Sequence, residues 1–512
     1  MFIKKKLCLL FALAVSVSVL FAGCGEDNKT TAENSVVETT DNPETTDAPE
    51  VTDAPENVVE GALQIDVASD REFQKIRGFG AGYTYYSNYL YWLEEYKDEV
   101  YDLLFKDANL TILRFKNGYK YDEENDYDTK VEREYYEKAK ERLNEDGLEP
   151  EVLMSSWSPA AYLKTSESLY GEGTIVKDKD GNYEYEKLGE YWRELVDYYE
   201  ENGVPIDYIS IQNEPDYVAA YESCTLKYME TEEAACYADA FMAVYDATRE
   251  CNNPPKMVGP DTMSCDSGDI ALLMSDIITK KPESLSAIAH HLYVGGEEGN
   301  ARSFNSNFRD IAMDYPDTEK WMSEYYRGNF MYTVQLIQNS LVYENLNAYI
   351  YWGGVWKGPV GKDMENLIGI DSGSTPEEWD HEHGYVIGEK YYSMRHFSEY
   401  ILPGYIRVGT NVDLTSLGEE TTPNTDEVSC SAYVSPEKDR MVIVAVNDLE
   451  EAKTYQLQLG NYNVSNSNII LTDYSKGEDT EEFYKEVGSL DENNCFEMPA
   501  HSVVTIVIDS EN

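Results

Sequence analysis

The sequence predicts an α/β fold in which a (β/α)8 TIM barrel carries an attached antiparallel β-sandwich. Stretches of strand and helix character alternate between residues 76 and 353, as a barrel of eight strand–helix units requires. After about residue 405 this alternation gives way to short strands separated by Asn, Gly and Ser, which is typical of a sandwich. Two glutamates follow the fourth and seventh predicted strands, where a barrel places its active site.

The first 24 residues have the features of a bacterial lipoprotein signal peptide. Lys4, Lys5 and Lys6 are followed by an apolar run that is too short to span a membrane and ends in Phe21-Ala22-Gly23-Cys24. Phe21 stands where leucine is more usual, and the alternative is a plain signal peptide with an incidental cysteine. We expect Cys24 to be lipidated and the protein to be extracellular, anchored at the surface of a bacterial membrane.

Residues 25–60 are rich in Thr, Glu, Asp and Pro, with Thr-Asp-Ala-Pro-Glu at 46–50 and again at 52–56. Such a segment cannot bury apolar area, so we expect a disordered acidic tether. The chain of 512 residues has a formal net charge of −56, which disfavours nucleic acids and anionic headgroups as partners. A neutral glycan is not disfavoured, and the 43 tyrosines are compatible with stacking on sugar rings.

The eight cysteines do not indicate a metal site. Cys8 lies in the signal peptide and Cys24 would carry the lipid, while the remaining six are widely spaced and form no CxxC pair. We therefore expect neither a bound metal nor a cofactor. Beyond the signal peptide no run of 18 apolar residues occurs, so we expect the remainder to be soluble. We expect a monomer, although nothing in the sequence decides the oligomeric state.

Eight strands are predicted for the barrel, at 76–82, 110–115, 150–156, 206–213, 256–260, 286–293, 319–325 and 347–353. Helical spacing of apolar residues occurs between them, for example over 133–147 and 191–203, each of which ends at a glycine. Leu63, Ile65 and Val67 alternate with polar residues and predict a strand before the barrel.

Two motifs carry the chemistry. Ile211-Gln212-Asn213-Glu214-Pro215 closes the fourth predicted strand, and Trp321-Met322-Ser323-Glu324-Tyr325-Tyr326 closes the seventh. Only a closed barrel brings glutamates so far apart in sequence together. Cleavage of a glycosidic bond with retention needs two carboxyl groups roughly 5–5.5 Å apart, one to donate a proton and one to attack. We therefore predict Glu214 as acid/base and Glu324 as nucleophile.

Through these motifs the chain resembles glycoside hydrolase family 30, which belongs to clan A of barrel enzymes, over roughly residues 63–509. The resemblance rests on the two glutamate motifs and on a set of shorter ones: Arg77-Gly78-Phe79-Gly80, Leu113-Arg114-Phe115, Ser156-Trp157-Ser158-Pro159, His290-His291-Leu292-Tyr293, Tyr351-Trp352 and Pro403-Gly404-Tyr405. In that family both chain ends build the sandwich. The resemblance thus implies a sandwich strand within 61–75, a catalytic barrel over 76–404 and the rest of the sandwich over 405–512.

The resemblance and the chemistry together assign six substrate-binding residues: Asn213, Trp157, Tyr293, Trp352, Arg114 and His291. Asn213 would bond a sugar 2-hydroxyl, and Tyr293 and Arg114 would orient Glu324. The two tryptophans would form the floor of the sugar subsites. For each residue a purely structural role is the alternative, and of the two histidines His291 is the better candidate.

The motifs are most similar to those of xylanases, so we expect an endo-β-1,4-xylanase of the glucuronoxylanase-like branch that acts by double displacement. Glucuronoxylanases of the family hold a glucuronate with an arginine after strand seven or eight. Here no arginine occurs between Arg327 and Arg395, and the loop after strand eight offers only Lys357 and Lys362. Strict dependence on glucuronate is therefore not expected.

Two kinds of alternative remain open. Within the family, a β-glucosidase, a β-1,6-glucanase or an exo-acting xylanase would carry the same glutamates, because loop shape decides substrate and mode of attack. In another class, the chain would be a non-catalytic glycan-binding surface lipoprotein, against which the two intact glutamates argue.

Overall fold

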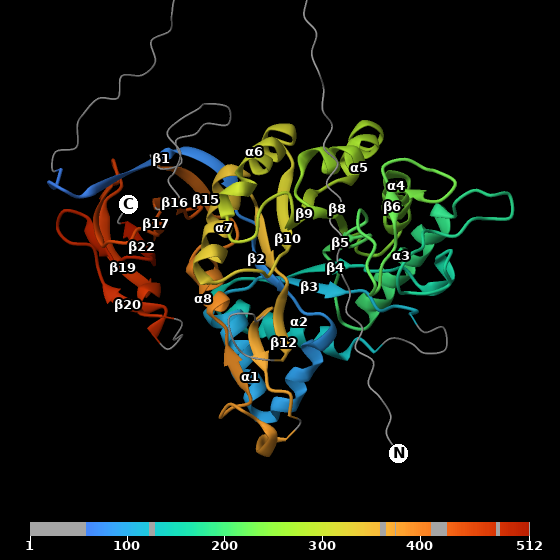
Figure 1. Cartoon of the computed structure of the whole chain (residues 1–512), viewed down its shortest axis with the longest axis horizontal. Coiled ribbons are helices and arrows are strands. Elements are labelled where there is room, and N and C mark those ends of the chain that lie inside the picture. Colours follow the sequence, from blue (N-terminus) through green and yellow to red (C-terminus); the bar gives the residue numbers. More distant parts are fainter. Residues whose placement is uncertain are drawn as a thin grey trace, which may run out of the picture. The chain divides into compact units, whose positions relative to one another are not determined.

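The structure, a computed structural model, describes residues 58–121, 128–358, 365–373, 375–410, 428–477 and 482–510 (Figure 1). The predicted signal peptide with Cys24, nearly all of the predicted tether and Lys362 lie outside the described residues. None of the helices within these ranges is long and apolar enough to cross a membrane.

In the described part of the chain, eight parallel strands close into a barrel in the order β10-β11-β2-β3-β4-β5-β8-β9. The strands are β2 (Gly78–Gly82), β3 (Ile112–Lys116), β4 (Glu151–Ser155), β5 (Tyr208–Ser210), β8 (Lys256–Ser264), β9 (Ala287–Val294), β10 (Glu319–Glu324) and β11 (Ala348–Tyr351). Each overlaps one of the eight predicted strands. The predicted fold class is confirmed.

A helix follows each barrel strand along the chain and covers the outside of the barrel (Figure 1). These helices are α1 (Lys97–Asp102), α2 (Lys130–Leu143), α3 (Tyr185–Glu201), α4 (Tyr237–Thr248), α5 (Ser267–Lys280), α6 (Asn305–Asp314), α7 (Phe330–Tyr343) and α8 (Glu389–Ser398). The α3 helix shows why helices could be predicted from the sequence: apolar residues recur at helical spacing and are all buried, namely Leu188, Trp192, Leu195 and Tyr199.

The barrel interior is filled by side chains that the strands turn inward. They are Ile112, Leu153, Tyr208, Val258, Ala287, Ala289, Trp321, Ala348 and Ile350. Neighbouring strands approach very closely at Gly80, where an added Cβ would overlap the carbonyl oxygen of Ile112. The interior is therefore a packed core, and the active site must lie at its rim.

The second part is a nine-stranded sheet, counted within the described residues, in the order β20-β19-β22-β17-β16-β15-β1-β18-β21. Its strands are β1 (Leu63–Lys75), β15 (Ile406–Thr410), β16 (Val428–Val434), β17 (Arg440–Asn447), β18 (Lys453–Gln458), β19 (Val464–Asp473), β20 (Lys485–Gly488), β21 (Cys495–Met498) and β22 (Ser502–Ser510). The first half of β1 pairs with β18 and the second half with β15, so this strand joins the two halves of the sheet.

His396 of α8 links the barrel to this sheet through two hydrogen bonds. Its two ring nitrogens lie 2.9 Å from the Thr505 hydroxyl and 2.8 Å from the Thr472 hydroxyl, on β22 and β19. Burial, assisted by the neighbouring Arg395, lowers the pKa of His396 to about 3. The ring is therefore neutral at physiological pH and acts as a buried hydrogen-bonding link.

Two small sheets were not predicted from the sequence. The loop after β11 forms the three-stranded sheet β12 (Gly353–Lys357), β13 (Asn366–Ile370) and β14 (Tyr385–Ile387), and the loop after β5 contains β6 (Leu226–Lys227) and β7 (Ala235–Cys236). Both loops leave the carboxyl ends of barrel strands and so extend the rim where the glutamates lie.

Candidate active site

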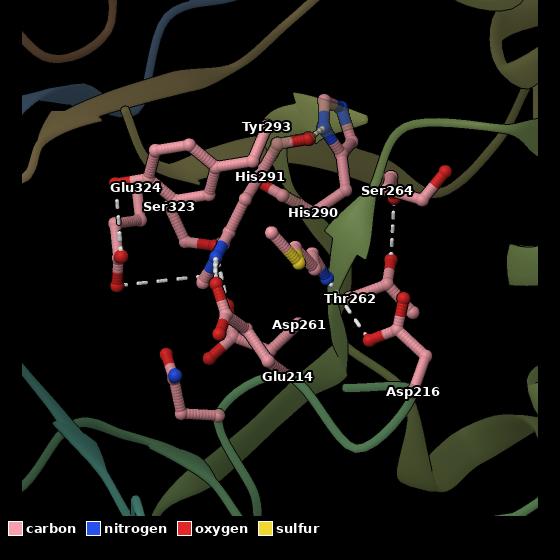
Figure 2. Close-up of polar contacts among 12 residues, drawn as sticks. Glu214, Asp216, Asp261, Thr262, Ser264, His290, His291, Tyr293, Ser323 and Glu324 are labelled. Atoms are coloured by element: carbon pink, nitrogen blue, oxygen red, sulfur yellow. Dashed lines mark hydrogen bonds and ion pairs between the residues drawn. The ribbon is translucent and has the colours of Figure 1, made fainter. Parts of the chain in front are cut away.

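Glu214 and Glu324 meet at the rim of the barrel, as their positions after the fourth and seventh strands predict (Figure 2). A carboxylate oxygen of each, together with a ring nitrogen of His291, lies within 4.8 Å of the others. Both glutamates are about 95% buried. The Glu214 backbone has φ +48°, a strained conformation for a residue with a side chain, and its N–H donates to the Asp261 carbonyl at 2.9 Å.

Arg114, in the middle of β3, is fully buried and orients the nucleophile candidate. One terminal nitrogen donates to Glu324 Oε2 at 2.5 Å, and the other donates to Asn213 Oδ1 at 2.7 Å and to Asp261 Oδ2 at 3.2 Å. Its Nε donates to the Ser155 hydroxyl at 3.1 Å. These bonds use all three nitrogens of the guanidinium, so Arg114 fixes four side chains of the site at once.

The Glu324 carboxylate has a second partner on its other oxygen. The Tyr293 hydroxyl donates to Oε1 at 3.1 Å. Burial raises the pKa of Glu324, while the cations His291 and Arg114 oppose that rise. Because both oxygens accept hydrogen bonds from fixed donors, the carboxylate is held in one orientation.

Asp261, within β8, is a site residue that was not predicted from the sequence. It is fully buried, accepts from the Ser210 hydroxyl at 2.7 Å and from the Ser323 hydroxyl, and forms ion pairs with Arg114 and His291. Burial alone would raise the pKa of Asp261, but Arg114, His291 and Ser323 hold it well below its usual range. Asp261 is thus a permanent negative charge beneath the two glutamates.

His291 lies between all three carboxylates. Its Nδ1 is 3.0 Å from Glu214 Oε1, and its Nε2 is 3.4 Å from Asp261 Oδ1 and 3.9 Å from Glu324 Oε2. Burial alone would lower the pKa of His291, but the three carboxylates raise it to about 10. His291 is therefore cationic at neutral pH. By contrast, His290 points to the Glu344 carboxylate at 2.5 Å, outside this cluster.

The glutamates open into a cleft of about 500 Å³. Its lining residues are mostly aromatic: Tyr85, Tyr86, Trp157, Glu214, Tyr217, Tyr221, Met263, Tyr293, Glu324, Tyr326, Arg327, Trp352, Trp356 and Glu365. Trp157 and Trp352 pack with their centroids 5.8 Å apart, and the Arg114 guanidinium lies 4.8 Å from the Trp157 ring. Aromatic side chains around paired carboxylates suit a ligand with both C–H faces and hydroxyl groups.

All eight active-site residues predicted from the sequence lie in or beside this cleft. The three cations noted after strands seven and eight, Arg327, Lys357 and Lys362, differ in their placement. Arg327 lines the cleft 5.3 Å from the Tyr293 ring and pairs with Glu298 at 3.4 Å. Lys357 instead lies against the rings of Tyr86 and Tyr89. Lys362 lies outside the described residues.

Glu214, His291 and Glu324 are close enough to hold a metal ion, but their charges do not fit one. A cation would have to displace the proton of His291 and the bond from Arg114 to Glu324. Metal-ligating histidine is neutral, and this histidine is held cationic by its neighbours.

The fold and the paired glutamates together define the architecture of a barrel glycosidase. The chain is 22% identical to glucuronoxylanase XynC of Bacillus subtilis, in one comparison over 99% of both chains. The XynC of strain 168 matches at 22% identity over 63% of this chain and 66% of its own, just under two thirds of that protein.

Solved structures agree with the fold. The catalytic domain of family 30 xylanase C from Talaromyces cellulolyticus superposes with a TM-score of 0.66 at 17% identity, over 87% of this chain and 100% of that domain. The endo-β1,6-glucanase BT3312 superposes with a TM-score of 0.63 at 15% identity, over 89% of this chain and 96% of its own. No family model matches the chain. The resemblance to glycoside hydrolase family 30 is confirmed by homology to XynC and by the shared fold.

Proposed function

We propose that the protein is a retaining glycoside hydrolase that cleaves β-linked plant cell-wall polysaccharide, with Glu324 as nucleophile and Glu214 as acid/base. The observation that carries the proposal is the placement of carboxylate oxygens of the two glutamates within 4.8 Å of each other. This separation suits direct attack by one carboxylate, because inverting enzymes hold their carboxyl groups roughly 6.5–9.5 Å apart to admit a water.

In the first step Glu324 attacks the anomeric carbon while Glu214 gives its proton to the leaving oxygen, so one C–O bond forms and the glycosidic bond breaks. Arg114 and Tyr293 hold Glu324 in place for this attack. Two cations, Arg114 and His291, lie against the carboxyl groups of Glu214, Asp261 and Glu324.

In the second step Glu214, now ionised, accepts a proton from water as the water oxygen attacks the anomeric carbon, and the bond to Glu324 breaks. His291 stabilises the ionised Glu214 between the steps, since its Nδ1 lies 3.0 Å from Glu214 Oε1. Asn213 has its oxygen occupied by Arg114, which leaves the amide nitrogen to donate to the sugar 2-hydroxyl.

The substrate we propose is a β-1,4-linked xylan, attacked internally. The homology to two glucuronoxylanases supports it. We expect glucuronate to be tolerated without being required, because Arg327 already pairs with Glu298 and Lys357 lies on two tyrosine rings. Selective recognition of a carboxylate favours an arginine whose fork is free for two parallel hydrogen bonds.

A β-1,6-glucan is the second candidate substrate, since an endo-β1,6-glucanase shares the barrel and the sheet domain. We further propose that the enzyme is extracellular, acylated at Cys24, and held away from the membrane by the acidic segment 25–60.

The direct test is a reducing-sugar assay on glucuronoxylan, arabinoxylan, β-glucan and pustulan, a β-1,6-glucan. Wild type should release sugar from the xylans, and Glu324→Gln should abolish this while retaining glycan binding. Glu214→Gln should cripple cleavage of polysaccharide and lose less on an activated aryl glycoside, with partial recovery in azide. Glu134→Gln, on outer helix α2, is the matched control. Near-normal turnover by Glu324→Gln would contradict the assignment.

A further inference from the structure

A continuous row of aromatic side chains leads out of the cleft beyond the residues already assigned. It starts at Trp352 and passes through residues that we call the aromatic wall: Trp356, Tyr86, Tyr89 and Trp92. Successive ring centroids along this row are 5.7, 4.9, 5.5 and 4.0 Å apart. Trp356 and Tyr86 line the cleft itself, so the wall is continuous with the catalytic centre.

The wall is open to solvent at its surface. Trp352 is 9% exposed whereas Tyr86 is 38% exposed, and the other wall residues are half-buried. The wall pairs Tyr86–Trp356, Tyr86–Tyr89 and Tyr89–Trp92 meet edge to face, a favourable arrangement of aromatic rings. Lys357 supports the wall, since its ammonium lies 4.5 Å from the Tyr86 ring and 5.0 Å from the Tyr89 ring. The rings are therefore positioned by the protein before any ligand arrives.

The order of the strands around the barrel determines which part of a bound glycan the aromatic wall would contact. Trp356 lies on β12, directly after strand β11, and the other wall residues lie in the segment Tyr85–Tyr96 directly after the neighbouring strand β2. Glu214 follows β5, which is diametrically opposite β11 in the closed barrel. In Figure 1, β12 and α1 accordingly lie at the bottom, while β6, in the loop after β5, lies at the right.

The acid must stand beside the oxygen that leaves, so the leaving part of the chain extends on the Glu214 side. The wall is on the opposite side of the rim and faces the part of the glycan that becomes bonded to Glu324. Flat C–H faces of successive sugar rings match a row of aromatic rings, and the wall's single cation does not demand an anionic ligand.

We propose that the aromatic wall binds the β-linked sugar units that precede the scissile bond, giving subsites on the non-leaving side beyond the sugar held at Trp352. This inference rests on the proposed function and deepens it, because it assigns length selectivity to the loops after β11 and β2. An enzyme with such a wall gains rate from each sugar added on that side.

The test uses aryl glycosides that carry one to five β-1,4-linked xylose units, and a parallel series built on glucose. The aryl leaving group is constant, so every added sugar extends on the non-leaving side only. For wild type, kcat/KM should rise with length. Tyr86→Ala and Trp92→Ala should lower kcat/KM about five- to tenfold on the longest substrate and less than about twofold on the shortest. Tyr86→Phe and Trp92→Phe keep a ring and should retain most of the gain.

Tyr245→Ala is the matched control, because Tyr245 is half-buried on outer helix α4 beneath the cations of Arg249 and Lys281. It should leave the length dependence unchanged. Equal losses of kcat/KM on substrates of all lengths, or no loss at any length, would overturn the proposed role of the aromatic wall. The proposed function would remain intact. A length-dependent loss on the glucose series alone would support the wall and replace xylan as the substrate. Activity on neither series would overturn both.

Discussion

Replacing Asp261 by Asn removes one charge from the catalytic cluster with little change in shape. Asp261 is fully buried, with Oδ1 3.4 Å from the Nε2 of His291. At an effective dielectric constant of about 20, that separation corresponds to an attraction on the order of 5 kcal/mol. We therefore expect Asp261→Asn to bring the pKa of His291 down from about 10 towards its ordinary value near 6.5.

The change is measurable as the pH dependence of stability. The pKa of His291 is higher in the folded protein than in the unfolded chain, so its stabilising contribution is complete below about pH 6.5 and is lost as pH rises towards 10. Between pH 7.5 and 9 folded wild type holds a proton that the unfolded chain releases, which costs about 1.4 kcal/mol per pH unit, or about 2 kcal/mol in all. In Asp261→Asn the loss over this interval should be under about 1 kcal/mol.

The assay is urea unfolding at pH 7.5, 8, 8.5 and 9, with kcat/KM on an aryl xyloside measured alongside. We expect Asp261→Asn to lose roughly 10- to 100-fold in kcat/KM, because Arg114 and His291 are no longer fixed from below. Asp371→Asn is the matched control, since Asp371, directly after β13, is buried and hydrogen-bonded to His381 at 2.8 Å. An unchanged slope together with normal activity in Asp261→Asn would refute the positioning role.

Three further predictions concern the nucleophile, the substrate and the anchor. Tyr293→Phe removes the 3.1 Å hydrogen bond to Glu324 and should lower kcat about tenfold with little change in KM; a change confined to KM would contradict it. The preference for glucuronoxylan over linear xylo-oligosaccharides should be modest and should weaken with salt, and a ratio of several hundredfold, about 3 kcal/mol, would reveal an unrecognised cation. Mass spectrometry of the membrane fraction should find Cys24 acylated, whereas recovery in the medium with an unmodified N-terminus would count against an anchor.

The barrel was predictable because its strands are apolar on both faces and each is followed by a helix or a polar loop. Glu214 and Glu324 were predictable for a related reason, since Glu324 is the last residue of β10 and Glu214 follows soon after the end of β5 at the rim. Asp261 was missed because β8 continues to Ser264 through polar residues, whereas the apolar pattern that predicts the strand stops at residue 260. A longer strand ending in buried polar groups carries no clear periodic signal.

The sequence does not indicate that the aromatic residues of the segment Tyr85–Tyr96 join Trp356 in one wall. Tyr86 and Trp356 lie 4.9 Å apart between ring centroids, although they are far apart in the sequence. They meet because β2 and β11 are neighbours in the closed barrel, and because β12 extends from β11 into an added sheet. Likewise, the sequence around Lys357, one of the two lysines in the loop after strand eight, does not indicate that its ammonium lies on two tyrosine rings.

The central claim is double displacement through Glu324, and the anomeric form of the first product tests it most directly. Proton NMR during early hydrolysis of a β-1,4-xylo-oligosaccharide, before mutarotation, follows the anomeric signal of the newly formed reducing end. Carboxylate oxygens within 4.8 Å of each other predict that the β anomer appears first and the α anomer only later. Early appearance of the α anomer would contradict the mechanism and the assignment of Glu324 as nucleophile.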